Sequence, residues 1–347
     1  MPEILDIFSQ DAFGLVSMTD AINKQPFIPG RLGQLGIFEP MGVMTDKISI
    51  EEYDGKLGLL NTQPRSGPAS KYTPSKRKVR VLPAPHIPFD THVAADEVRG
   101  VRVFGSSDQL QAVQTIVNQR LGEMVGYHDA TLEYHRIGAV KGTILDADGS
   151  TLYNLFTEFE VTQETEVAFD LSAGSPAAGA VRKKCHSIIR LIRKHLGATP
   201  MSGVMCICGS AFFDDLVSHT EVAKAYERWM ENGQQGEFLR KQLVGQFTGI
   251  PFNYAGIFFE EYVGSVNDSD FVHTDKAHFF PVGVRGLFKT YFAPSNWISD
   301  VNTIGLPRYA KIVREDPADR YVSVMTQQNP LNICTRPKVL IQGKRGA

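Results

Sequence analysis

The chain has 347 residues, 42% of them hydrophobic, and a formal net charge of −2 at pH 7. It can bury a sizeable core in one or two domains, and it lacks the global positive charge typical of proteins that hold nucleic acid or anionic membranes. No apolar run reaches transmembrane length, and the first twenty residues carry no basic residue, so neither a membrane span nor a signal peptide is expected.

Residues 1–40 are expected to form an extended arm that lies along other structure. Gly30, Gly33 and Gly36, with Pro29 and Pro40 on either side, do not favour a regular element.

Residues 41–84 predict a long two-stranded β-hairpin. Apolar residues alternate at Ile48 and Ile50 and again at Val79 and Val81, and the stretch between them is rich in Pro, Gly and Ser. No acidic residue occurs from 55 to 89, where the cations include Arg65, Lys71, Lys76, Arg77, Lys78 and Arg80. An isolated two-stranded hairpin is only marginally stable. We therefore expect an acidic partner surface, and a protein in preference to nucleic acid, because Tyr72 is the only aromatic residue at the tip.

A single long helix is predicted from about Ser107 to Val140, where apolar residues recur three or four apart. It would be about 50 Å long, with Ser106 and Gln109 as a capping box. Gly122 and Gly126 mark where the helix would bend or be closely approached. The Asp148-Gly149 pair after it predicts a second, tight hairpin.

An acidic stretch follows at residues 157–176, with the opposite sign to the cationic hairpin. Four of its carboxylates are candidates for pairing with the cationic hairpin of another subunit. They are Glu158, Glu160, Glu164 and Glu166.

The remainder predicts an α+β region of short mixed elements. An amphipathic helix covers residues 177–198, a buried strand contains Cys206 and Cys208, and further helices and strands follow. Two strands at the C-terminus are expected to return to the first domain. The four cysteines form no C-x-x-C pair, so buried, reduced thiols in a cytoplasmic setting are expected.

No catalytic, cofactor-binding or metal site is predicted. His273, Asp275 and His278 have the chemistry of metal ligands but no recognised spacing, and Asn267, Asp268 and Asp270 lack the Gly and Glu of a calcium loop. Two functions stay open from the residues alone: an interaction protein that assembles through its arm and hairpin, or an enzyme with an unrecognised site in the C-terminal α+β region.

Four motifs carry a resemblance to a known family. They are ATLEYHRIGAVKGTILDADGSTLYNLF (130–156), HFFPVGVRGLFKTYFAP (278–294), VNTIGLPRYAK (301–311) and QQNPLNICTRPKVLI (327–341). In combination they resemble the major capsid protein E family of tailed double-stranded DNA phages and prophages, the lambda-type capsid proteins.

The resemblance implies the Hong Kong 97-type phage capsid fold. Its parts would be an N-terminal arm (1–40), an extended loop (41–90), a peripheral domain (91–176) with a spine helix (106–141), an axial domain (177–315), and C-terminal strands that return to the peripheral domain (316–347).

The resemblance also implies a structural protein that is not an enzyme. Its copies would form the hexamers and pentamers of an icosahedral shell around packaged DNA, assembled in the host cytoplasm and found in the virion. Its implied partners are itself, a separate scaffold, a maturation protease, the portal and a decoration protein. Sequence-specific nucleic-acid binding, membrane association and covalent cross-linking are not expected.

Overall fold

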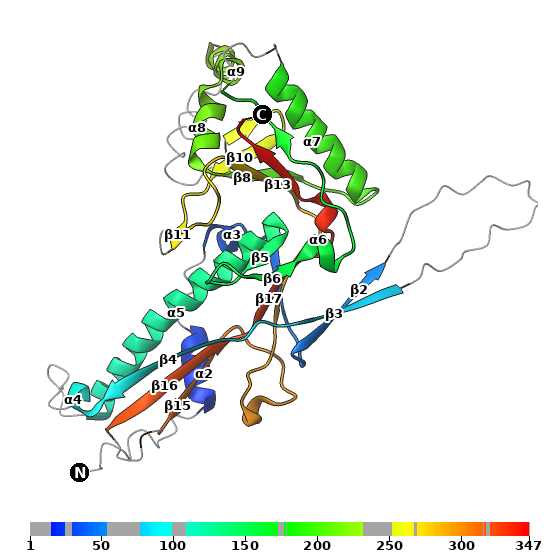
Figure 1. The fold of residues 1–347 in the computed structure, drawn as a ribbon. Coiled ribbons are helices and arrows are strands. Elements are labelled where there is room, and N and C mark those ends of the chain that lie inside the picture. The colour runs from blue at the N-terminus through cyan, green and yellow to red at the C-terminus, as the bar shows by residue number, and fades with distance from the viewer. Residues whose placement is uncertain are drawn as a thin grey trace, which may run out of the picture. The chain divides into compact units, whose positions relative to one another are not determined.

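The computed structural model describes residues 15–24, 30–53, 77–98, 109–172, 177, 179–231, 252–266, 269–314, 316 and 320–346. Helices and strands are mixed along the chain (Figure 1), which confirms the α+β prediction. The chain divides into two compact units: unit 1 comprises 1–50, 79–134 and 289–333, and unit 2 comprises 51–78, 135–288 and 334–347.

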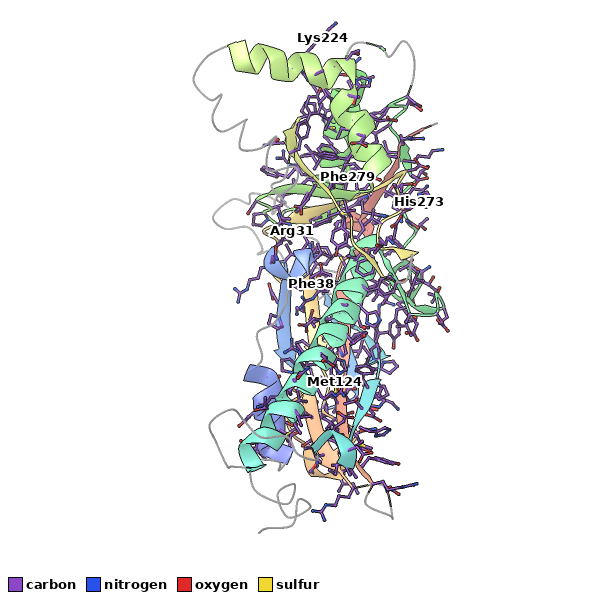
Figure 2. All side chains as sticks on the ribbon, turned by 90° about the vertical axis from the view of Figure 1, so that its left-hand side faces the viewer. Arg31, Phe38, Met124, Lys224, His273 and Phe279 are labelled. Carbon is purple, nitrogen blue, oxygen red and sulfur yellow. The ribbon has the colours of Figure 1, made fainter. Side chains whose placement is uncertain are left out.

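The core of unit 1 lies between helices and an antiparallel sheet. The sheet has the strand order β15 (Tyr309–Val313), β16 (Tyr321–Gln328) and β4 (Ile87–Ala94). Helices α2 (Leu15–Lys24) and α5 (Gln109–Lys141) share its buried cluster, in which Met124 of α5 can be located in Figure 2. The cluster consists of Met18, Ile22, Val93, Val117, Leu121, Met124, Val125, Ala310, Val322 and Val324.

The expectation that residues 1–40 contain no regular element is wrong. Helix α2 forms because Met18 and Ile22, four residues apart, enter the core, while the Thr19 hydroxyl donates to the Ala310 carbonyl at 3.3 Å. A short helix α3 (Arg31–Gln34) forms although it contains Gly33. The buried Glu133 carboxylate of α5 accepts hydrogen bonds from the Leu32 and Gly33 amides at 2.6 and 3.3 Å. It thereby pairs amide groups at the start of α3 that have no partner within that short helix.

A second sheet of unit 1 joins the first part of the chain to its end. Strand β1 (Phe38–Gly42) pairs with β14 (Phe288–Phe292), which pairs with β17 (Pro330–Cys334). A buried hydrogen bond links the last two strands, from the Thr290 hydroxyl to Asn332 Oδ1 at 2.6 Å.

A buried ion pair connects three elements of unit 1. Arg308 Nη2 lies 2.5 Å from Asp129 Oδ1 of α5, and Arg308 Nη1 donates to the Ile22 carbonyl of α2 at 3.3 Å. Both charged side chains are nearly inaccessible to solvent. Removing one partner of such a pair typically costs about 3–5 kcal/mol, because the other charge stays buried.

The long helix is confirmed, with 33 residues described as helical. Ser106 of the predicted capping box and Ser107, the expected start of the helix, lie outside the described residues. Nothing in the described part of this chain closely approaches Gly126, since a Cβ there would meet no atom within 4 Å. The crowded glycine is Gly138, where a Cβ would come within 3.0 Å of the backbone of Thr143 and Ile144. The close contact therefore comes from the hairpin that immediately follows.

Both predicted hairpins are present. Strands β5 (Thr143–Leu145) and β6 (Thr151–Asn154) pair around a turn in which Gly149 has a φ of +83°. Strands β2 (Lys47–Tyr53) and β3 (Arg77–Pro83) lie side by side as a two-stranded ribbon (Figure 1). At its base the Ala84 amide donates to the Asp46 carbonyl at 2.8 Å.

Unit 2 is built on one six-stranded sheet. Its strand order is β7 (Val167–Ala168), β18 (Ile341–Lys344), β13 (Lys276–Val282), β8 (Gly203–Cys208), β10 (Ile257–Glu261) and β9 (Phe252–Tyr254). Both edge strands are short, which limits pairing with other chains.

The C-terminal strands do not all belong to one unit. Strands β16 and most of β17 lie in unit 1, whereas β18 pairs with β13 in unit 2. Three strands form where two were expected, because the turn around Pro337 separates β17 from β18. The expected domain limits thus differ from the observed packing units at the end of the chain.

The longer helices in the described part of unit 2 include α7 (Ala180–Leu196), α8 (Ser210–Ser218) and α9 (Thr220–Glu231). An aromatic cluster fills the core, where Phe279 of β13 stacks on Phe169 at 5.6 Å and meets Phe259 edge-on at 5.9 Å. Phe169 in turn contacts Phe212 of α8. The short strands β11 (Ser265–Val266) and β12 (Ser269–Asp270) form a separate pair.

Across the described parts of both units, no helix combines the length and apolar character needed to span a bilayer.

Candidate functional site

The residues with metal-ligand chemistry do not form a site. His278 is buried in β13, whereas His273 is exposed and its Nδ1 accepts from the Asp275 amide at 3.2 Å. Asp275 pairs with Arg345 at 3.1 Å. Within the described residues no three His, Cys, Asp or Glu side chains are grouped so that they could hold a metal ion. Asn267 and Asp268 lie outside those residues.

The cysteines are buried and unpaired by disulfides, as expected. Burial raises the pKa of Cys185 and of Cys334 to about 12, so both thiols are protonated at neutral pH. Since the thiolate is the reactive form, neither residue is suited to nucleophilic chemistry.

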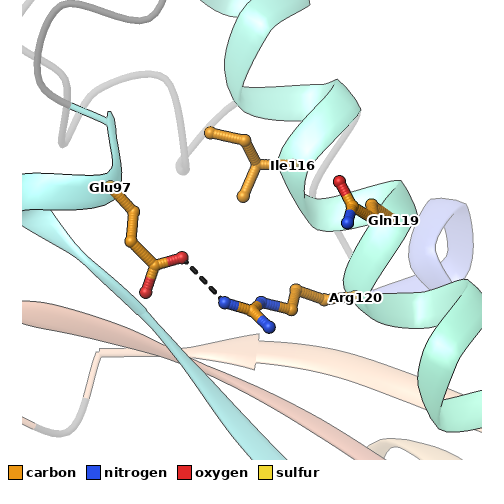
Figure 3. A pocket seen from close by; sticks show the side chains of 4 residues that line it. All are labelled: Glu97, Ile116, Gln119 and Arg120. Atoms are coloured by element: carbon orange, nitrogen blue, oxygen red, sulfur yellow. Dashed lines mark hydrogen bonds and ion pairs between the residues drawn. The ribbon is translucent and has the colours of Figure 1, made fainter.

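A pocket of about 320 Å³ opens beside α4 (Ala95–Val98) and the first turns of α5 (Figure 3). It is lined by Glu97, Ile116, Gln119 and Arg120. Arg120 lies 2.9 Å from Glu97 and 3.5 Å from Glu123, and the hydrogen bond and charge of Glu97 raise the pKa of Arg120. Its charge is therefore already balanced by two carboxylates, and the lining offers no nucleophile or acid–base pair.

The cationic hairpin has two different faces. Ile48, Ile50 and Leu82 are buried, whereas Val79 and Val81 of β3 are 58% and 53% exposed. The ribbon therefore presents an apolar surface in addition to its cations. Among the predicted contact residues, Arg77, Lys78 and Arg80 lie on β3, and Arg80 is half-buried. Arg65, Lys71 and Lys76 lie outside the described residues.

The predicted acidic partners lie in unit 2, around and after the short helix α6 (Leu155–Glu158). Glu164 lies 2.8 Å from His195 of its own chain, and Glu166 lies 2.6 Å from Lys276 of its own chain. Glu158 ends α6 and Glu160 follows it in a turn with a φ of +51°. The pairing of these four carboxylates with a neighbour's hairpin stays a prediction.

The sequence analysis missed an exposed apolar surface on the loop between β14 and β15. Ile298, at the start of the 3₁₀ turn η3 (Ile298–Asp300), is 93% exposed, and Val301 and Ile304 are 61% and 58% exposed. Leu306 of the same loop is also exposed, as are Met41 of β1 and Met44 just after β1, a segment that is hydrogen-bonded to this loop through Val43 and Gly305. We call these six residues the loop surface. The sequence does carry one sign of this surface, because apolar residues recur in this loop among the turn-forming residues Ser, Asp, Asn and Gly.

Several hydrogen bonds hold this loop in place. The Gly305 amide donates to the Val43 carbonyl at 2.8 Å, and the Leu306 amide donates to the Tyr309 hydroxyl at 2.8 Å. Within the loop, the Ser295 hydroxyl donates to Asp300 and the Thr303 hydroxyl to the Asp300 carbonyl. The apolar side chains are thus exposed from a fixed backbone, an arrangement typical of protein–protein contact surfaces.

Comparison with known proteins gives a consistent result. The family model described as "Phage major capsid protein E" matches residues 14–345. The major capsid protein of Pseudomonas phage KPP10 is 26% identical over 355 residues, and that of Salmonella phage Felix O1 is 24% identical over 371 residues. Each alignment covers 96% of this chain and 97% of the relative. Among solved structures, the cyanophage Pam1 capsid subunit has 13% identity and a TM-score of 0.46, over 90% of this chain and 88% of the other.

Proposed function

The chain belongs to the phage major capsid protein E family, and we propose that its copies assemble into hexamers and pentamers through the loop surface and the β2–β3 hairpin. As a major capsid protein it forms the icosahedral shell of a phage and is part of the virion. It is thus a structural protein whose task is to bind further copies of itself.

The observation that carries this proposal is the exposure of apolar residues on two ordered elements of unit 1. Ile298, Val301 and Ile304 on the loop, and Val79 and Val81 on the hairpin, are all more than half exposed. Apolar burial supplies about 25 cal/mol per Å², so two such surfaces can provide much of the affinity between copies. Contacts of this size need not hold a pair of subunits tightly, because a closed shell repeats them many times.

Charge would then set the register of the contact. Exposed ion pairs contribute only about 0–1 kcal/mol each. We therefore assign the hairpin cations and the carboxylates after α6 to orientation, in agreement with the prediction from sequence. Assembly would take place in the host cytoplasm, with a separate scaffold, a maturation protease, the portal and a decoration protein as further partners.

The expressed protein tests the proposal by size-exclusion chromatography and negative-stain electron microscopy. Wild-type protein should give capsomers, tubes or shells. Ile298→Asp with Val301→Asp should abolish or strongly reduce them, because two carboxylates would be placed in the apolar contact, while the variant stays soluble.

The matched control is Val263→Asp with Val16→Asp, which changes two other apolar residues that are both more than half exposed. It should assemble as the wild type does. Normal particles from the loop variant, or equal losses in both variants, would contradict the role of the loop surface.

A further inference from the structure

We propose that the exposed face of α7 is a sequence-independent binding site for the phosphate backbone of double-stranded DNA. The proposal rests on the proposed function in one respect, since a shell subunit meets DNA as the contents of the shell. The helix α7 is seen in Figure 1 as the long helix of unit 2.

The charge of this helix is strongly one-sided. Its 17 residues include six Lys or Arg and two His, and no acidic residue. The face toward the core is apolar, formed by Val181, Cys185, Ile188, Ile192 and Leu196. The exposed positions are Arg182, Lys183, His186, Ser187, Arg190, Arg193 and Lys194. We call these seven residues the α7 basic face.

The carboxylates near α7 leave this face unneutralised. Asp170 pairs with Lys184 at 2.6 Å and Glu164 with His195 at 2.8 Å, both on the half-buried flanks of the helix. Glu221 accepts hydrogen bonds from the Val181 and Arg182 amides at the helix start. No carboxylate in the described part of the chain lies within ion-pair distance of Lys183, Arg190, Arg193 or Lys194.

Helix stability does not account for the pattern. Arg193 and Lys194 in the last turn are favourable with the helix dipole. Arg182 and Lys183, however, lie in the first turn, where a cation is unfavourable. Arg190 and Lys194 are four residues apart, a spacing at which like charges destabilise an isolated helix. These cations are therefore present although they lower the stability of the helix itself, which indicates a binding role.

The chemistry of the face favours DNA phosphate over an acidic protein. Protein interfaces have a core of apolar and aromatic anchors, and none of the seven exposed residues is an aliphatic residue or a Phe, Tyr or Trp. Phosphate recognition needs only cations, with arginine as the strongest partner. The face also lacks Asn and Gln, the usual readers of adenine, so it would bind without regard to sequence.

Its length matches a short run of DNA. From Lys183 to Lys194 the helix rises about 16 Å, which corresponds to about five base pairs at 3.4 Å per base step. With a net charge of −2 for the whole chain, such a site would bind weakly and depend strongly on salt. Weak binding suits a shell whose contents must leave it.

Fluorescence anisotropy of the full chain with a labelled 20-base-pair duplex of mixed sequence tests the site, at 50 mM and 200 mM salt. The variant is Lys183→Gln with Arg190→Gln and Lys194→Gln. The control, Lys224→Gln with Arg285→Gln and Lys338→Gln, removes the same number of exposed Lys and Arg from other elements. Lys224 is labelled in Figure 2.

We expect the control to bind within about twofold of the wild type and the α7 variant to bind at least about tenfold more weakly at 50 mM salt. The slope of log K against log salt should become shallower by about 2.7, since each lost phosphate contact removes about 0.9. Equal affinities for the two variants, or no binding by the wild type at 50 mM salt, would overturn the proposal.

Competition with polyglutamate of equal charge tests the alternative that the α7 basic face binds an acidic protein and not DNA. If polyglutamate displaces the labelled duplex as effectively as unlabelled duplex does at equal charge concentration, the face has no preference for DNA phosphate and the DNA proposal is wrong. Particle formation by the same variants, scored by electron microscopy, separates this result from the proposed function. We expect the α7 variant to form normal shells while it loses DNA affinity.

Discussion

At the scale of single residues, the stability of unit 1 depends on buried polar groups that join segments far apart in sequence. Arg308 connects the start of β15 to Asp129 of α5 and to the Ile22 carbonyl of α2. Glu133 of α5 holds the start of α3. Each of these groups is costly to leave unsatisfied. They therefore fix the N-terminal segment on α5 more specifically than apolar packing would.

Buried histidines make the protein sensitive to acid. Burial lowers the pKa of His128 and of His135 to about 4, with Arg308 adding to the effect at His128, and lowers that of His278 to about 3. All three are thus neutral in the folded protein. In the unfolded chain a histidine has a pKa of about 6.5 and takes up a proton below that pH. Stability is therefore fully present above pH 6.5 and is lost as the pH falls toward 4.

We predict that the free energy of unfolding decreases from pH 7 to pH 5 by up to about 2 kcal/mol for each of these histidines. His128→Gln, which keeps a donor for the Thr326 hydroxyl 2.9 Å away, should remove about that much of the decrease. Urea unfolding of the wild type and the variant at pH 7 and pH 5 measures this decrease in the free energy of unfolding. The exposed His186→Gln should leave the decrease unchanged, and an identical pH dependence in both variants would show that His128 makes no contribution.

At the scale of secondary-structure elements, one glycine inside α5 and one directly after it should respond in opposite ways to replacement by alanine. Gly142 ends α5 with a φ of +86°, and a Cβ there would lie 2.3 Å from the ring of Phe156. Gly142→Ala should lower the free energy of unfolding by about 2 kcal/mol or more. The strain of an alanine in a left-handed conformation and the clash with Phe156 both contribute to this loss. Gly126 lies in the helix interior, where an added Cβ would meet nothing within 4 Å, so Gly126→Ala should stabilise by up to about 1 kcal/mol.

Thermal unfolding of the two variants beside the wild type measures the difference. Destabilisation by Gly126→Ala would mean that another surface approaches the helix at that position, as the sequence first suggested.

At the scale of the whole molecule, assembly should depend on the sign of the hairpin charge. Reversing Lys76, Arg77 and Lys78 to Glu should lower particle yield while the subunit stays soluble, because like charges would then meet at the neighbour's carboxylates. Reversing Lys224, Arg285 and Lys338, three exposed cations on other elements, should leave the yield unchanged. Electron microscopy and sedimentation of the assembled fraction measure both. Normal particles with all three hairpin charges reversed would refute this role.

Local patterns determined much of this protein from sequence alone. The three-to-four spacing of apolar residues predicted α5, and alternation beside Asp148-Gly149 predicted the β5–β6 hairpin, because both signals depend on neighbours within a few residues. The same holds for the amphipathic α7 and the buried β8. The combination of motifs also identified the family that the full-length match confirms.

Only the tertiary structure decided which distant segments meet. Helix α2 forms where Met18 and Ile22 find a core supplied by residues as far along the chain as Ala310 and Val324, and α3 is held by Glu133, so neither is visible in local sequence. The assignment of β18 to the sheet of unit 2 depends on its partner β13. The loop surface likewise became apparent only when exposure could be measured, because the sequence of a loop does not show whether its apolar residues are covered by the rest of the chain or left for another copy.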